Sequence, residues 1–168
     1  MEVLIRFIRC TQYSMKMLTN SINAMPIESQ QKTAETQKQI YLQHVTQLYT
    51  DIRNWLQSEP FYLKNTEIEI QEVLGRYLVP QLSIQTDTGE VLANLKPAGA
   101  SVLGADGLIM VEGWLDKGYV LYLRKNETDG IETDGWYWEE QRLNMPPHFL
   151  NKTQFLQLIT WVSDYEFV

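Results

Sequence analysis

An acidic loop at residues 126–135 carries the densest set of oxygen donors in the chain. Carboxylate and carbonyl oxygens are the ligands that calcium prefers, and an EF-hand loop places carboxylates at its first and twelfth positions with glycine at the sixth. Whether Gly130 or Gly135 takes the sixth position, neither the first nor the twelfth position carries a carboxylate. We therefore interpret this segment as a solvated hairpin loop and predict no metal site.

A second chemical candidate is Asp87-Thr88-Gly89, which has the residues of the aspartic protease triplet. In that chemistry two aspartates from two such triplets share one proton. Here the polar residues Gln85 and Thr86 precede the aspartate, and the triplet occurs only once. The segment is therefore interpreted as a hairpin turn.

The remaining catalytic residue types lack the neighbours that their chemistry requires. His44 and His148 have neither the spacing of a zinc pair nor an adjacent nucleophile. Ser101 lacks the glycines of a nucleophile elbow, and no phosphate-binding glycine motif occurs. We predict no catalytic residue and no cofactor. If the protein is an enzyme, the available acid–base groups are Asp134, Glu139 and Glu140.

Aromatic residues are the unusual feature of the sequence, and they concentrate around Trp136-Tyr137-Trp138. In a strand, Trp136 and Trp138 would share one face and Tyr137 would lie on the other. Core packing is the first explanation, since a small sheet covered by helices needs large apolar groups. The alternative is an exposed patch, because Trp, Tyr and Arg dominate interface hot spots. The candidate binding residues are Trp114, Arg124, Trp136, Tyr137, Trp138 and Arg142.

Composition excludes several classes of protein. The net charge of −7 argues against nucleic-acid binding, which needs clustered Lys and Arg, but it would suit a basic partner. No apolar run approaches the roughly 20 residues of a membrane span. Cys10 is the only cysteine, so no intrachain disulfide can form. We expect a cytoplasmic protein that is not inserted in a membrane.

The longest predicted element is an amphipathic helix from Thr33 to Gln57. Apolar residues recur there in steps of three and four, which is the period of one helix face. They are Tyr41, Val45, Leu48, Ile52 and Trp55. Thr33 can cap the helix, Glu59-Pro60 stops it, and its stripe is wide enough to cover one face of a sheet.

Five breaks that run from Asp to Gly divide residues 67–139 into short segments rich in Val, Ile, Leu, Tyr and Trp. This pattern predicts an antiparallel meander of about five to seven short strands. Pro80 indicates an edge position or a bulge, because proline cannot donate to a ladder. In the segment from Tyr119 to Leu123, the residues that would point to either face of a strand are all apolar. We therefore expect a central strand that is covered on both faces.

Two further expectations concern connections. Residues 96–101 contain proline and glycine and are predicted to form a loop. The segments 102–104 and 108–111 would then pair with each other as a hairpin around Ala105-Asp106-Gly107.

Asn151 is predicted to cap a final helix whose Phe155, Leu158, Ile159 and Val162 share one face. The order of helix, meander and helix predicts the α+β class, with both helices on one face or at the ends of the sheet. We expect residues 31–168 to form a single α+β domain. Residues 1–30 form an N-terminal segment for which the sequence predicts no structure.

These observations favour a non-enzymatic protein-interaction module, such as an adaptor or an inhibitor of a basic partner. The alternative is a small-ligand-binding domain with an aromatic pocket between the long helix and the sheet, in which Arg76, Arg124 or Arg142 supplies the polar anchor. An enzyme is the third hypothesis.

Overall fold

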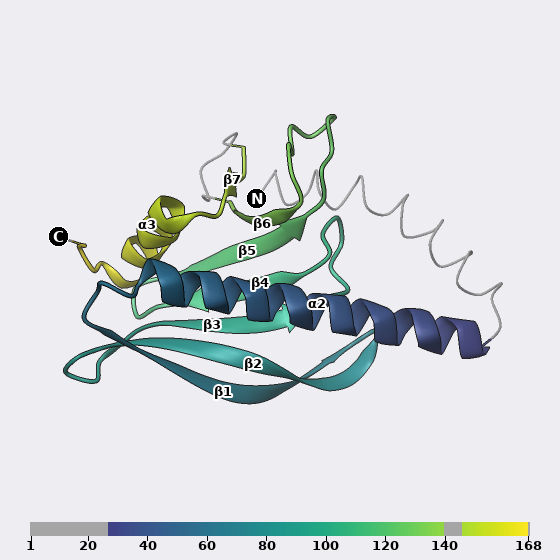
Figure 1. Cartoon of the computed structure of the whole chain (residues 1–168), viewed down its shortest axis with the longest axis horizontal. Helices are drawn as coiled ribbons and strands as arrows, with labels where there is room; N and C mark the ends of the chain where they lie inside the picture. The colour runs from purple at the N-terminus through teal and green to yellow at the C-terminus, as the bar shows by residue number, and fades with distance from the viewer. Residues whose placement is uncertain (1–26, 140–145, 168) are drawn as a thin grey trace.

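The computed structural model describes residues 27–139 and 146–167, and the expectations that concern other residues lie outside these ranges. A long helix, α2 (Ile27–Trp55), precedes seven strands, and a shorter helix, α3 (Lys152–Ser163), follows them (Figure 1). The strands are β1 (Phe61–Glu72), β2 (Gly75–Thr86), β3 (Val91–Gly99), β4 (Leu108–Glu112), β5 (Lys117–Leu123), β6 (Gly135–Trp138) and β7 (His148–Phe149). The predicted α+β class is confirmed.

The strands form one antiparallel sheet in which each strand lies beside its neighbours in the sequence, from β1 to β7. The predicted meander is confirmed, although β1 and β2 are longer than expected at 12 residues each. Asp87 and Thr88 form the predicted turn, with Gly89 at φ 86°. Since β1, β3 and β5 begin where β2, β4 and β6 end, the turns alternate between two ends of the sheet.

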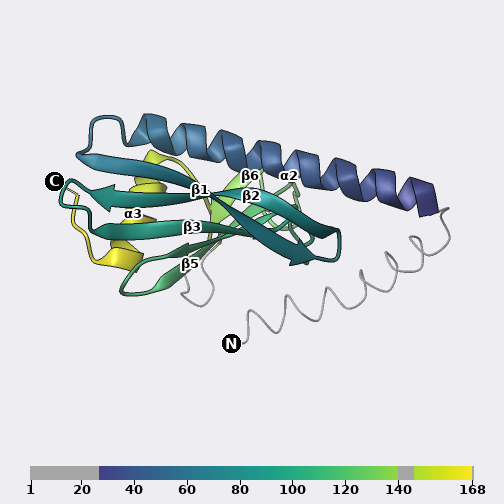
Figure 2. The ribbon, with the colours of Figure 1, turned by 90° about the horizontal axis from the view of Figure 1, so that it is seen from below.

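Helix α2 runs along one side of the sheet, as Figure 2 shows. Its predicted stripe is confirmed: Tyr41, Val45, Leu48 and Ile52 are at most 2% exposed. The helix begins at Ile27 rather than Thr33, since neither glycine nor proline interrupts the intervening residues.

Two tyrosine hydroxyls tie α2 to backbone carbonyls of the sheet. Tyr41 donates to the Leu108 carbonyl at 2.7 Å, and Tyr49 donates to the Leu95 carbonyl at 3.0 Å. Burial raises the pKa of both phenols well above its ordinary value, so both remain neutral donors.

Both helices cover the same face of β5. His44 of α2 stacks on Tyr122, and Gly118 lies so close to α3 that an added Cβ would meet Leu158 Cδ1 at 2.5 Å. Residues four apart on a strand point to the same side. The opposite face carries Tyr119, which is 42% exposed, so the expectation that both faces of this strand are covered is wrong there. The strand is interior to the sheet, as predicted, but the helices cover only one side of it.

The hairpin of β1 and β2 is strongly twisted. Its pairing stays in register from Phe61 opposite Thr86 to Glu72 opposite Gly75. In β2, however, the buried side chain of Val79 has an odd number, whereas the buried side chains of Leu82 and Ile84 have even numbers, so the buried face of the strand changes between them. A right-handed twist of a two-stranded ribbon explains this change. Pro80 lies outside the residues of β2 that pair with β3, which is the edge position expected for it.

The predicted loop at residues 96–101 is wrong, because β3 continues to Gly99 and pairs there with Leu108. Residue Val102 makes only an isolated bridge to Ala105, so the expected hairpin of residues 102–104 with 108–111 is also wrong. A distant carboxylate explains the difference: Glu72 accepts hydrogen bonds from the amides of Ala100 at 3.0 Å and Ser101 at 2.7 Å.

Helix α3 starts at the predicted cap, where the Asn151 side chain accepts a hydrogen bond from the Gln154 amide at 3.0 Å. We expect Asn151→Ala to lower the free energy of unfolding by about 1 kcal/mol, because a helix amide loses its acceptor. Denaturant unfolding measures the change. Asn151→Asp retains an acceptor and should stay near wild-type stability; equal stability of all three proteins would contradict the capping role.

Candidate functional site

The turn between β4 and β5, residues 113–116, is held by the end of helix α3. The amides of Leu115 and Asp116 both donate to the Val162 carbonyl, at 3.0 and 3.1 Å, and the Trp114 indole donates to the Ser163 carbonyl. The last four carbonyls of a helix have no partner within it. The turn supplies the missing donors, so its backbone is fixed by α3.

Gly113 permits this close contact. A Cβ at this position would lie 2.1 Å from the Val162 carbonyl oxygen. No side-chain rotation could relieve this clash, because the backbone fixes the position of a Cβ and the carbonyl oxygen is itself a backbone atom. The turn and the helix therefore depend on a residue without a side chain at this point.

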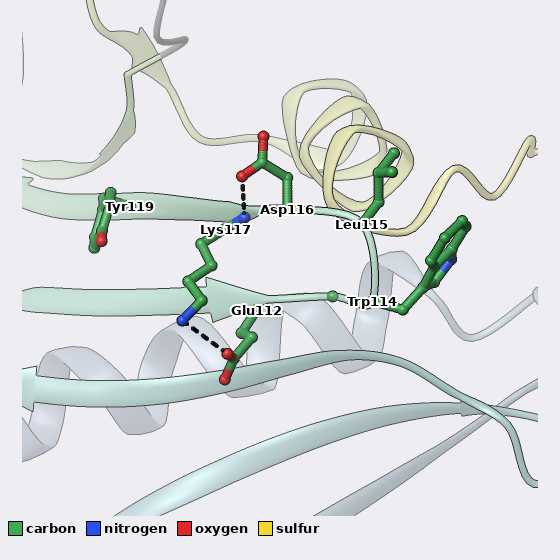
Figure 3. A pocket seen from close by; sticks show the side chains of 7 residues that line it. Glu112, Trp114, Leu115, Asp116, Lys117 and Tyr119 are labelled. Atoms are coloured by element: carbon green, nitrogen blue, oxygen red, sulfur yellow. Dashed lines mark hydrogen bonds and ion pairs between the residues drawn. The ribbon is translucent and has the colours of Figure 1, made fainter.

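Two large apolar side chains on this fixed turn are exposed to solvent: Trp114 is 66% exposed and Leu115 is 54% exposed. Figure 3 shows Trp114 extending away from the turn, and Lys117 reaching across β4 to Glu112. The surface here forms a shallow depression of about 440 Å³, which Tyr119 also lines. We call Trp114 and Leu115 the apolar tip.

Charged residues beside the apolar tip are linked across the strands. The Glu112 carboxylate pairs with Lys96 and, at 3.0 Å, with Lys117. Hydrogen bonds from these two ammonium groups lower the pKa of Glu112, and the same contact raises the pKa of Lys117. Glu112 and Lys117 therefore both keep their charges around neutral pH, and the one carboxylate is shared by two lysines.

The end of the sheet that carries the apolar tip is acidic. The connection from β2 to β3 lies at this end by topology, and the chain after α3 adjoins the turn through the contact with Ser163. We call the exposed carboxylates there the acidic end: Asp87, Glu90, Asp116, Asp164 and Glu166. Two lysines at this end already have partners, since Lys117 pairs with Glu112 and Lys152 lies 3.9 Å from Glu59. The surplus charge is negative.

A groove of about 690 Å³ opens at the same end, where β6 finishes. Helix α3, the chain that follows it and the last residue of β6 form its walls. The lining residues are Trp138, Thr153, Leu156, Gln157, Thr160, Trp161, Glu166 and Phe167.

The structure does not bring the five candidate binding residues that it describes into one site. Trp136, Tyr137 and Trp138 are 7, 5 and 5% exposed, so packing accounts for them and they form no exposed patch. The predicted alternation is present: Trp136 and Trp138 join the large core under the helices, while Tyr137 packs with Leu123 and Ile131 on the other face.

Arg124 is exposed and pairs with Asp106, but it follows β5 and lies at the opposite end of the sheet from Trp114. Arg142 lies outside the described residues. Trp114 alone of the six combines an exposed aromatic side chain with a fixed backbone. Sequence reasoning missed Leu115 as its neighbour, although two adjacent large apolar residues between Gly113 and Asp116-Lys117-Gly118 were an available signal.

His44 has a packing role. Its ring stacks on Tyr122 with centroids 3.7 Å apart and planes 8° apart. Its Nδ1 is buried and has no hydrogen-bond partner in the described part of the chain. Burial lowers the pKa of His44, and the Arg124 charge acts in the same direction, while Asp106 and Asp134 act against it.

Two further findings concern ligands and membranes. Within residues 27–139 and 146–167, no three His, Cys, Asp or Glu side chains are grouped so that they could hold a metal ion. No helix in these ranges combines the length and the apolar character needed to cross a membrane.

Comparison with known proteins adds no assignment: no family model matches the chain, and no curated protein or solved structure matches it either.

We expect Gly113→Ala to lower the free energy of unfolding by about 1–3 kcal/mol, because the new methyl group displaces the turn from α3. Chemical denaturation provides the measurement. The exposed Ser58→Ala change serves as the control and should alter stability by less than about 0.5 kcal/mol. Wild-type stability of Gly113→Ala would show that α3 and the turn do not meet as described.

The lowered pKa of His44 predicts a pH dependence of stability. Between the folded pKa and the ordinary value near 6.5, the unfolded chain binds more protons, so stability falls as the pH falls through this range. Unfolding at pH 7.5 and pH 5 should therefore show a larger loss for the wild type than for His44→Gln, which cannot titrate. Equal losses in the two proteins would remove His44 as the cause.

Proposed function

We propose that this chain is a non-enzymatic protein-interaction domain that binds a basic protein through the acidic end and the apolar tip. The observation that carries the proposal is that Trp114 and Leu115 are more than half exposed although their backbone is fixed by α3. Folding does not bury these side chains, so a partner can bury them.

A fixed apolar tip suits recognition on energetic grounds. Binding costs free energy when flexible side chains and loops become ordered, and a turn that is already held by hydrogen bonds avoids much of that cost. Tryptophan is the residue most typical of binding hot spots, because it buries a large area with few rotatable bonds. The neighbouring Tyr119 extends the apolar surface along β5.

The charge around the tip favours a basic partner. Asp116 and Asp164 flank the tip directly, and Glu90 and Glu166 lie at the same end. Complementary charge speeds the encounter of two proteins and disfavours acidic partners. The net charge of −7 on the whole chain also attracts basic proteins and repels acidic ones.

The alternative of a ligand pocket between α2 and the sheet receives little support. The space there is filled by Tyr41, Val45, Leu48 and Tyr49, all at most 2% exposed. Our proposal places the protein in the cytoplasm, since its single cysteine suits a reducing compartment.

Affinity capture with matched variants tests the proposed function. The immobilised wild-type chain should retain a basic protein from an extract of its own source, and salt near 0.5 M should weaken the complex. Trp114→Ala should lower the affinity for that protein by about thirtyfold, corresponding to about 2 kcal/mol.

Val73→Ala is the matched control, because Val73 is 91% exposed at the opposite end of the sheet. It should bind like the wild type. Retention of the same protein by Trp114→Ala at unchanged affinity, or selective retention of acidic proteins, would contradict the proposal.

A further inference from the structure

The groove beside β6 combines aromatic walls with a single charge. Of its eight lining residues, three are aromatic and Glu166 is the one that carries a charge. Trp138 is 5% exposed, while Trp161 and Phe167 are partly buried.

We propose that this groove receives a lysine or arginine side chain of the basic partner. The inference rests on the proposed function and deepens it, because it names the group that the partner contributes. An aromatic ring face is negative and attracts a cation placed over it, most strongly when the ring is tryptophan. The Glu166 carboxylate adds a direct ion-pair partner for the same cation.

The walls of the groove are held in position by contacts outside it. Phe167 packs edge to face against Phe61 at 5.8 Å and against Tyr165 at 5.1 Å. The Thr160 hydroxyl donates to the Tyr165 carbonyl at 2.8 Å, which ties the chain after α3 back to the helix. The groove therefore does not need to be assembled when a side chain enters.

Other ligand classes fit the groove less well. An anion would be repelled by the Glu166 carboxylate. A purely apolar group would leave Glu166 beside it without a partner, at a cost in desolvation. A long side chain with an apolar stem and a cationic end matches both parts, because its methylene groups can lie on Trp161 and Leu156.

Peptide titration of the full chain tests the groove directly. The probes are capped tripeptides with glycine on both sides of lysine, arginine or norleucine, whose side chain is apolar and uncharged. We expect the lysine or arginine peptide to shift the indole N–H signals of Trp138 and Trp161 in nuclear magnetic resonance spectra, with a Kd of roughly millimolar. Norleucine should bind at least fivefold more weakly.

Glu166→Gln should weaken binding of the cationic peptide about fivefold or more and should leave norleucine binding unchanged. The control is Glu127→Gln, which removes an exposed carboxylate from the loop between β5 and β6, at the opposite end of the sheet from the groove, and should bind like the wild type. Circular dichroism confirms that each variant is folded.

Three results would overturn the inference: no shift with either cationic peptide, equal binding of norleucine, or unchanged binding by Glu166→Gln. The Trp114→Ala variant distinguishes failure of this inference from failure of the proposed function. It should still bind the cationic peptides in the groove but should bind the basic protein more weakly. If the protein partner still depends on Trp114 while the peptides do not bind, the inference about the groove is wrong and the proposed function stands.

Discussion

The packing of α2 across the sheet is the interaction on which the rest of the structure depends. A twisted meander with one open face cannot bury its apolar side chains alone, and α2 supplies a stripe that is almost fully buried. The hydroxyls of Tyr41 and Tyr49 fix where this stripe lies, because each must reach one carbonyl of the sheet. The helix therefore determines which face of the sheet remains available to solvent.

A second constraint acts at the end of α3. The Val162 carbonyl accepts two amides of the turn after β4, and Gly113 lets the two backbones approach. These hydrogen bonds give a carbonyl at the end of α3 its donors, and they also fix the turn on which Trp114 and Leu115 are exposed to solvent. One turn therefore both completes the end of α3 and carries the proposed binding residues. The groove that includes Glu166 is lined by other residues of α3 and of the chain that follows it.

Local patterns in the sequence predicted the elements well. The stripe of α2, the turn at Asp87, the cap at Asn151 and the alternation around Tyr137 all follow from residues within one turn or one strand. These features could be predicted because the period of the apolar residues and the chemistry of caps and turns are set by near neighbours.

Features that depend on distant contacts could not be predicted in the same way. The continuation of β3 depends on Glu72, the packing of His44 depends on Tyr122, and the fixed position of Trp114 depends on α3. The sequence pattern showed many aromatic residues but could not separate the buried Trp138 from the exposed Trp114, since only the folded chain determines which of them a helix covers.

The central claim is that the apolar tip stands on a preformed backbone, and amide hydrogen exchange at Leu115 and Asp116 tests it most directly. Our account predicts that both amides exchange slowly, like those in the interior of β4 and β5, because both donate to the Val162 carbonyl. Exchange at the rate of an unstructured peptide would show that the turn is not held by α3, and this result would contradict the account.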